Sequence, residues 1–138
     1  MRLALLALVV AAPAFAFPPA AKVASACPKG AHARKVTECS AMRRVTAELQ
    51  ACGKFDFVDI YTPGPADKPE LRMSEKIALQ PEAKTAKPRM GAPKLYKGKG
   101  VELAINWTTS PDPKTGGHHG TLSFGATKNV DVTCKMVK

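Results

Sequence analysis

The sequence predicts an α+β domain in which one N-terminal helix packs on a four- or five-stranded antiparallel sheet stabilised by disulfides. Three observations predict this class. Apolar residues recur every three or four positions over residues 36–52, as on one face of a helix. Apolar and polar residues alternate in several segments after residue 55, as in half-buried strands. The 4 cysteines of this short chain indicate a disulfide framework.

Residues 1–16 have the features of a cleavable signal peptide. Arg2 provides a charged start, residues 3–12 are all apolar, and Ala14 and Ala16 place small residues at a cleavage site. The apolar run is well short of the roughly 20 residues that span a bilayer. We therefore expect a secreted, extracellular protein with no stable membrane insertion.

An N-terminal arm and then a helix are expected to open the mature chain. Residues 17–35 are rich in Pro, Ala and Lys and are expected to form the arm. Thr37 can cap a helix over 38–52, Glu38 lies in its first turn, and Gly53 ends it. Residues 36–138 are expected to form a single domain. The apolar face of the helix comprises Val36, Cys39, Met42, Val45, Leu49 and Cys52.

Strands are expected to follow the helix. Residues 55–61 are rich in aromatic and β-branched side chains and precede a Pro- and Gly-rich turn. Residues 70–80 have a helical composition, but their large apolar side chains share one side at a period of two, which favours a strand.

Further strands are expected toward the C-terminus. Alternation over 101–108 predicts a half-buried strand. A strand around Leu122 and Phe124 is expected to turn near Lys128 into the last strand, over 130–136.

A basic loop over 81–100 is the sharpest candidate site. It lacks an apolar period and is expected to be long and mobile, and every charged residue between Ala83 and Val101 is basic. Such a loop can follow a phosphate backbone, and its tyrosine can stack on a base or sugar. The alternative is a solvated loop with no partner. The candidate polyanion-binding residues are Lys84, Lys87, Arg89, Lys94, Tyr96, Lys97 and Lys99.

The overall charge favours anionic partners. The chain has 21 Lys and Arg against 11 Asp and Glu, and loss of Arg2 with the signal peptide leaves a formal charge of +9. RNA, acidic glycans and anionic membranes would all be attracted by this positive charge, and the charge alone does not distinguish among them.

The cysteines Cys27, Cys39, Cys52 and Cys134 are expected to form two disulfides. On a continuous helix, Cys39 and Cys52 would lie roughly 20 Å apart, whereas a disulfide requires Cα atoms within about 7 Å. Two pairings remain: Cys27–Cys39 with Cys52–Cys134, and Cys27–Cys52 with Cys39–Cys134. We favour the first, because pairing with Cys52 would require the arm to run nearly straight beside the helix.

Signatures of catalysis are scarce. The 3 histidines are His32, His118 and His119, and no nucleophile elbow or phosphate-binding glycine loop is present. Adjacent histidines in a Gly-rich turn are most often solvated, so no metal site or cofactor is assigned. Asn106 begins an Asn-x-Thr sequon and is a candidate glycosylation site.

The order of helix, antiparallel sheet and closing cysteine strand resembles the small fungal guanyl ribonucleases and the basic ribotoxins. Residues 120–134, Gly-Thr-Leu-Ser-Phe-Gly-Ala-Thr-Lys-Asn-Val-Asp-Val-Thr-Cys, resemble the family's penultimate strand, turn and closing strand. The lysine-rich loop is similar to that of ribotoxins.

The resemblance implies a scaffold without the catalytic set. Phe124 stands where the family has its catalytic His, residues 101–103 lack its Arg, and only Glu75 matches its Glu. Inactive ribonuclease-like scaffolds occur among secreted effectors of plant-pathogenic fungi. The resemblance also implies a Cys27–Cys134 bridge, in conflict with the pairing favoured above.

We therefore expect a secreted, monomeric, non-enzymatic, effector-like protein, acting outside the cell or translocated into a host. Its expected partners are RNA, a host protein or an anionic surface, and no cofactor is expected. One alternative is an active ribonuclease or other small hydrolase that uses His118 or His119 with Glu75 or Glu102. Another is an extracellular inhibitor or structural protein.

Overall fold

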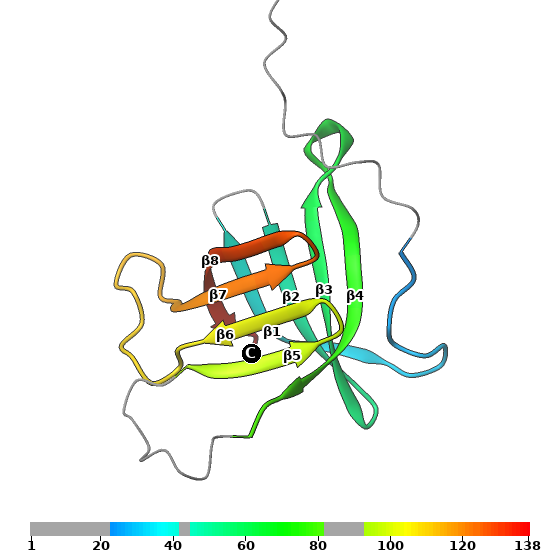
Figure 1. Ribbon diagram of the computed structural model, residues 1–138, viewed down its shortest axis with the longest axis horizontal. Coiled ribbons are helices and arrows are strands. Elements are labelled where there is room, and N and C mark those ends of the chain that lie inside the picture. The colour runs from blue at the N-terminus through cyan, green and yellow to red at the C-terminus, as the bar shows by residue number, and fades with distance from the viewer. Residues whose placement is uncertain (1–22, 42–44, 82–92) are drawn as a thin grey trace, which may run out of the picture.

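A closed barrel of antiparallel strands is formed in the computed structural model, which describes residues 23–41, 45–81 and 93–138 (Figure 1). The expected signal peptide lies outside these residues. Each strand pairs with the next in sequence, and the last pairs with the first. The strands are β1 (Ala33–Ala41), β2 (Val45–Cys52), β3 (Phe55–Pro63), β4 (Pro69–Leu79), β5 (Lys94–Gly98), β6 (Val101–Ile105), β7 (His118–Phe124) and β8 (Thr127–Met136).

The expected α+β class is wrong, because the segment assigned to a helix forms β1 and β2. The described residues contain no α-helix, only the short 3-10 turn Pro65–Asp67. Inward-facing positions alternate along both strands: Thr37 and Cys39 are buried on β1, and Val45, Ala47 and Leu49 on β2. The helical pattern fitted the larger apolar side chains but passed over Thr37 and Ala47, which complete the period of two.

The barrel closes where β1 and β8 meet. Cys39 lies directly opposite Cys134 in the antiparallel ladder, and the two form a disulfide with a Cα–Cα distance of 4.0 Å. The bond joins residues 95 positions apart in the sequence, so it fastens the first strand to the last.

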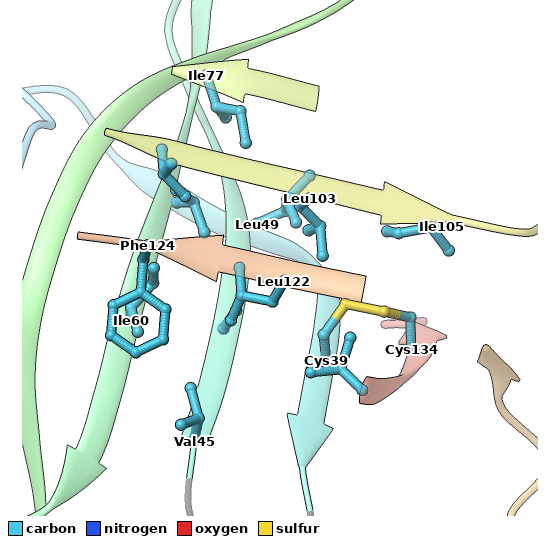
Figure 2. Packing of buried hydrophobic residues seen from close by; sticks show 14 residues of the cluster. Cys39, Val45, Leu49, Ile60, Ile77, Leu103, Ile105, Leu122, Phe124 and Cys134 are labelled. Atoms are coloured by element: carbon cyan, nitrogen blue, oxygen red, sulfur yellow. A yellow bond between two sulfur atoms is a disulfide. The ribbon is translucent and has the colours of Figure 1, made fainter. Parts of the chain in front are cut away.

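Side chains fill the interior of the barrel. Leucine, isoleucine and valine side chains from strands all around the barrel pack with Phe124 and the Cys39–Cys134 bond (Figure 2). Eight strands enclose a space just wide enough for such filling. Gly120 makes room for the disulfide, because a Cβ there would lie 2.8 Å from the Ala104 carbonyl oxygen and 3.2 Å from Cys134 Sγ.

Several strand predictions are confirmed and others need correction. The strands expected over 55–61 and 70–80 correspond to β3 and β4. Residues 94–98, expected within a mobile loop, form β5, because Tyr96 pairs with Leu103 and packs against the core. The strand expected over 101–108 ends at Ile105, and the last turn lies at Gly125 rather than near Lys128.

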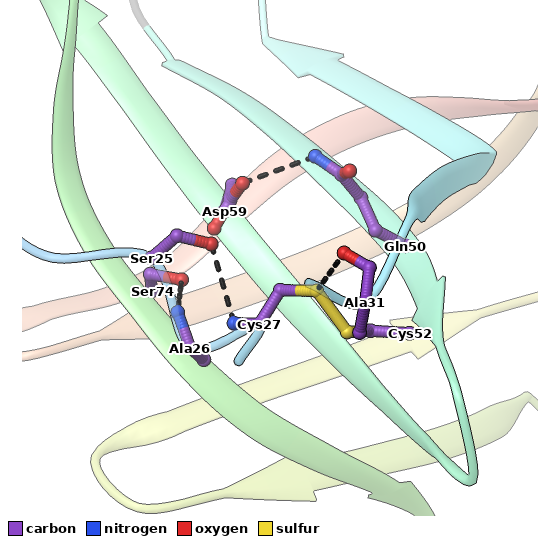
Figure 3. The surroundings of a disulfide bond; sticks show 8 residues. All are labelled: Ser25, Ala26, Cys27, Ala31, Gln50, Cys52, Asp59 and Ser74. Atoms are coloured by element: carbon purple, nitrogen blue, oxygen red, sulfur yellow. Dashed lines mark hydrogen bonds between the residues drawn. A yellow bond between two sulfur atoms is a disulfide. The ribbon is translucent and has the colours of Figure 1, made fainter. Parts of the chain in front are cut away.

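Residues 23–32, part of the expected arm, form an N-terminal strap over the outer face of β2–β4 (Figure 3). Cys27 is bonded to Cys52, and the Ala26 N–H donates to Ser74 Oγ at 2.7 Å. Phe57 is fully buried although it lies outside the core cluster, which is consistent with cover by the strap.

Two disulfides are thus confirmed, but the pairing favoured from the sequence is wrong. The observed bonds, Cys27–Cys52 and Cys39–Cys134, are the second of the two pairings left open. The Cys27–Cys134 bridge implied by the ribonuclease resemblance is not formed either. The preference for Cys27–Cys39 depended on a helix that does not exist, since β2 runs back alongside β1 and brings Cys52 to the strap.

Candidate functional site

The described residues at the two ends of the barrel differ in their exposed charge. One end, here called the basic end, carries the connections β2–β3, β4–β5 and β6–β7, the entry into β1 and the exit from β8. Among the described residues, its exposed carboxylates are Asp56 and Asp112. The exposed cationic side chains of the described residues at this end are Lys29, Arg34, Lys54, Lys76, Lys94, Lys114, Lys135 and Lys138.

The opposite end carries the connections β1–β2, β3–β4, β5–β6 and β7–β8, and its described residues show a smaller excess of exposed cations. Its exposed described acids are Asp67 and Glu102, whereas Asp131 lies midway along β8. Lys97 there contacts Glu102 at 3.5 Å, so part of its charge is neutralised locally. The exposed described cations at this end are Lys68, Lys97, Lys99 and Lys128.

A shallow depression adjoins the basic end beside the β1–β8 seam. It encloses about 600 Å³ and brings Lys114 of the β6–β7 connection next to Lys135, Met136 and Val137 of the chain's last residues. Its floor includes polar side chains of β1 and β8, among them Glu38. Basic and apolar side chains from distant parts of the sequence thus line one hollow.

The residues assigned to a basic loop are divided by the fold. Lys84, Lys87 and Arg89 lie outside the described residues. Lys94 begins β5 at the basic end, whereas Lys97 and Lys99 lie toward the opposite end. Tyr96 points into the barrel and is half-buried against the core, which leaves its ring little room to stack on a base.

The histidines do not converge with the candidate acids. His32 is exposed on the strap. His118 points inward at the basic end, with its ring edge-on to Trp107 at 5.1 Å, and its buried Nδ1 has no partner among the described residues. His119 points outward, and its Nε2 lies 3.3 Å from Asp131 Oδ1.

The candidate acids lie elsewhere on the wall. Glu75 is on β4, and Glu102 pairs with Ser123 on the far half of β7 and contacts Lys97. Asp112, six residues before His118 in the sequence, accepts a hydrogen bond from the Lys114 N–H at 2.8 Å within its own loop.

Asp59 is a buried carboxyl on the outer face, under the strap (Figure 3). Its exposure is 5%; Oδ2 accepts a hydrogen bond from Gln50 Nε2 at 3.0 Å, and Oδ1 has no partner among the described residues. Burial raises the pKa of Asp59, the Ser74 hydroxyl opposes part of that rise, and the nearby Glu48 carboxylate adds to it.

A small ionic cluster flanks Asp59 on the same face. Lys35 Nζ contacts Glu38 at 2.9 Å and Glu48 at 3.1 Å, and these hydrogen bonds raise the lysine's pKa. Burial, followed by the charges of Asp59 and Glu48, raises the pKa of the Tyr61 hydroxyl. The cluster is paired internally, which suits a structural role in the wall.

Asn106 directly follows β6, and its Oδ1 accepts a hydrogen bond from Thr108 Oγ1 at 3.1 Å. The sequon therefore lies in a turn at the basic end. Within the described ranges, no group of three or more His, Cys, Asp or Glu side chains is arranged to hold a metal ion. No helix in the same ranges is long and apolar enough to cross a membrane.

Sequence reasoning missed most of the basic end. Arg34, Lys54, Lys114 and Lys135 are far apart in the sequence and form no motif; only the closed barrel gathers them. A correct strand assignment would have predicted that these four residues lie at one end of the barrel, since every second connection in an antiparallel order lies at the same end. Comparison with protein-family models, curated proteins and solved structures found no match for the chain.

Proposed function

We propose that this protein is a secreted binding protein that contacts a polyanion through the basic end of its barrel. The uneven distribution of charge carries the proposal: among the described residues, eight exposed cations face two exposed carboxylates at the basic end, against four and two at the opposite end. Clustered cations raise the local concentration of an anionic partner and release its counterions on binding. The pair of disulfides fits an oxidising, extracellular setting.

Binding is favoured over catalysis because the histidines lie apart from Glu75 and Glu102, the glutamates considered as their catalytic partners. The alternative hydrolase would use a histidine and a glutamate as general acid and general base, so both would have to lie within reach of the substrate. His119 faces Asp131, and neither Glu75 nor Glu102 forms a hydrogen bond with a histidine among the described residues. RNA incubated with the protein is therefore expected to bind and to stay intact.

Two matched variants test this proposal. The first replaces Lys94, Lys114 and Lys135 with Gln at the basic end, and the second replaces Lys68, Lys99 and Lys128 with Gln at the opposite end. Both variants remove the same net charge, so a difference in their RNA affinity shows which end of the barrel binds the RNA. Binding of a fluorescent single-stranded RNA is measured by anisotropy at two salt concentrations.

The basic-end variant should bind at least about tenfold more weakly, and its slope of log affinity against log salt should fall by roughly two to three. The opposite-end variant should remain within about twofold of the wild type. Equal losses in the two variants would show that net charge, and not the basic end, determines binding.

A further inference from the structure

Exposed apolar side chains lie among the cations of the basic end. Over the described residues, the large apolar side chains that remain exposed are Leu79 at 50%, Met136 at 67% and Val137 at 42%. Leu79 ends β4 and Met136 ends β8, so all three belong to the basic end. A purely electrostatic partner would leave these side chains in water.

Aromatic residues occupy the same end. Phe55 begins β3 and Trp107 follows β6, and both are half-buried. Lys76 Nζ lies 4.5 Å above the Phe55 ring. Tryptophan with neighbouring lysines is typical of the interface between water and lipid, where the ring enters the boundary and the lysine stem extends its charge toward headgroups.

We propose that the basic end docks on a bilayer surface that contains anionic lipids. This inference rests on the proposed function and names the polyanion. The lysines complement the charge of the headgroups, and Leu79, Met136 and Val137 enter the interfacial layer, which removes them from water. Nucleic acid fits this end less well, because the most exposed apolar side chains, Leu79, Met136 and Val137, carry no ring to stack on bases, and the rings of Phe55 and Trp107 are half-buried.

The hollow beside the β1–β8 seam supports the same partner. Met136 and Val137 line this hollow together with Lys114 and Lys135. Apolar and cationic groups therefore meet within one depression, as the binding of an amphiphilic lipid requires. Leu79, on β4, supplies an apolar contact from another part of the same end.

Vesicles of phosphatidylcholine, with or without about one third phosphatidylserine, test the inference. The chain has 1 tryptophan, and Trp107 lies at the proposed contact. We expect sedimentation with the anionic vesicles only, a blue shift of Trp107 fluorescence and quenching by brominated lipids. Equal binding to both vesicle types, or binding to neither, would overturn the inference.

A second variant separates lipid docking from general polyanion binding. Leu79→Ser, Met136→Ser and Val137→Ser together keep every charge and alter only exposed positions. This variant should bind anionic vesicles at least about tenfold more weakly and bind the fluorescent RNA as the wild type does. Unchanged vesicle binding would refute the inference and leave the proposed function standing. If the wild type bound neither RNA nor vesicles, both this inference and the proposed function would be refuted.

Discussion

The two disulfide bonds lie on opposite sides of the barrel wall. Cys39–Cys134 lies within the apolar core and joins the first strand to the last. Cys27–Cys52 lies outside and fastens the N-terminal strap to β2 (Figure 3).

The surroundings of the two bonds differ as much as their positions. The inner bond packs among leucine, isoleucine and valine side chains, whereas the outer bond is close to the polar side chains of Ser25, Gln50, Asp59 and Ser74. The inner bond therefore maintains the closure of the fold, and the outer bond maintains a layer laid over it. The two should be separable by experiment.

Removing the inner bond should have the largest effect. Cys39→Ala with Cys134→Ala releases a cross-link of 95 residues, and for a loop of this length chain entropy accounts for roughly 4–5 kcal/mol of unfolding free energy. That is a large part of the stability of a domain this size. Urea denaturation followed by circular dichroism should show one cooperative transition at a much lower midpoint. A loss below about 2 kcal/mol would mean that the β1–β8 hydrogen bonds close the barrel without help.

Removing the outer bond should cost less and leave the barrel closed. Cys27→Ala with Cys52→Ala releases a cross-link of 25 residues, worth at most about 3.5 kcal/mol. The strap should then detach, and trypsin should cut after Lys29 while the rest of the chain resists digestion. If this variant unfolds as completely as the inner one, the strap is part of the cooperative barrel and the contrast between the two bonds fails.

The strands of the later part of the chain could be read from sequence because their alternation is regular and turn residues flank them. β3 ends at Pro63 before a glycine, and β6 alternates cleanly from Val101 to Ile105. The first hairpin could not be read in this way. Residues 42–44, Met-Arg-Arg, between β1 and β2 contain no glycine or proline, and the Ala, Glu, Leu and Gln of β2 favour a helix by intrinsic propensity. Pairing of β2 with β1 and β3 overrides that propensity.

The candidate site was even less accessible to sequence reasoning. A run of lysines in one segment is visible by inspection, and Lys94 does belong to the basic end. Lys54, Lys114 and Lys135 are isolated in the sequence and meet only through the order of the strands. Because the first hairpin was predicted to be a helix, the sequence did not predict a closed barrel. Without a closed barrel, the lysines could not be assigned to one of its two ends.

The smallest expected effect concerns Asp59 under the strap. Because the pKa of Asp59 is raised in the folded protein, its carboxyl is more readily ionised in the unfolded chain. At a pH below the pKa of Asp59 in the unfolded chain, the carboxyl is protonated in both the folded and the unfolded state, and its burial carries no electrostatic cost. As the pH rises toward neutrality, the buried charge lowers the stability of the folded state. Asp59→Asn removes this charge and should raise unfolding free energy by about 1 kcal/mol at neutral pH.

The pH dependence distinguishes this effect from a simple packing change. The difference in Tm between Asp59→Asn and the wild type should be small near pH 3–4 and grow toward pH 7. Asp56→Asn, an exposed carboxyl on the same strand, is the control and should show no such growth.

Asp59→Asn combined with loss of the outer disulfide sharpens the comparison between the two sides of the wall. Once the strap is free, water reaches position 59 and the stabilisation should vanish, whereas a persistent gain would mean that the strap does not cause the burial.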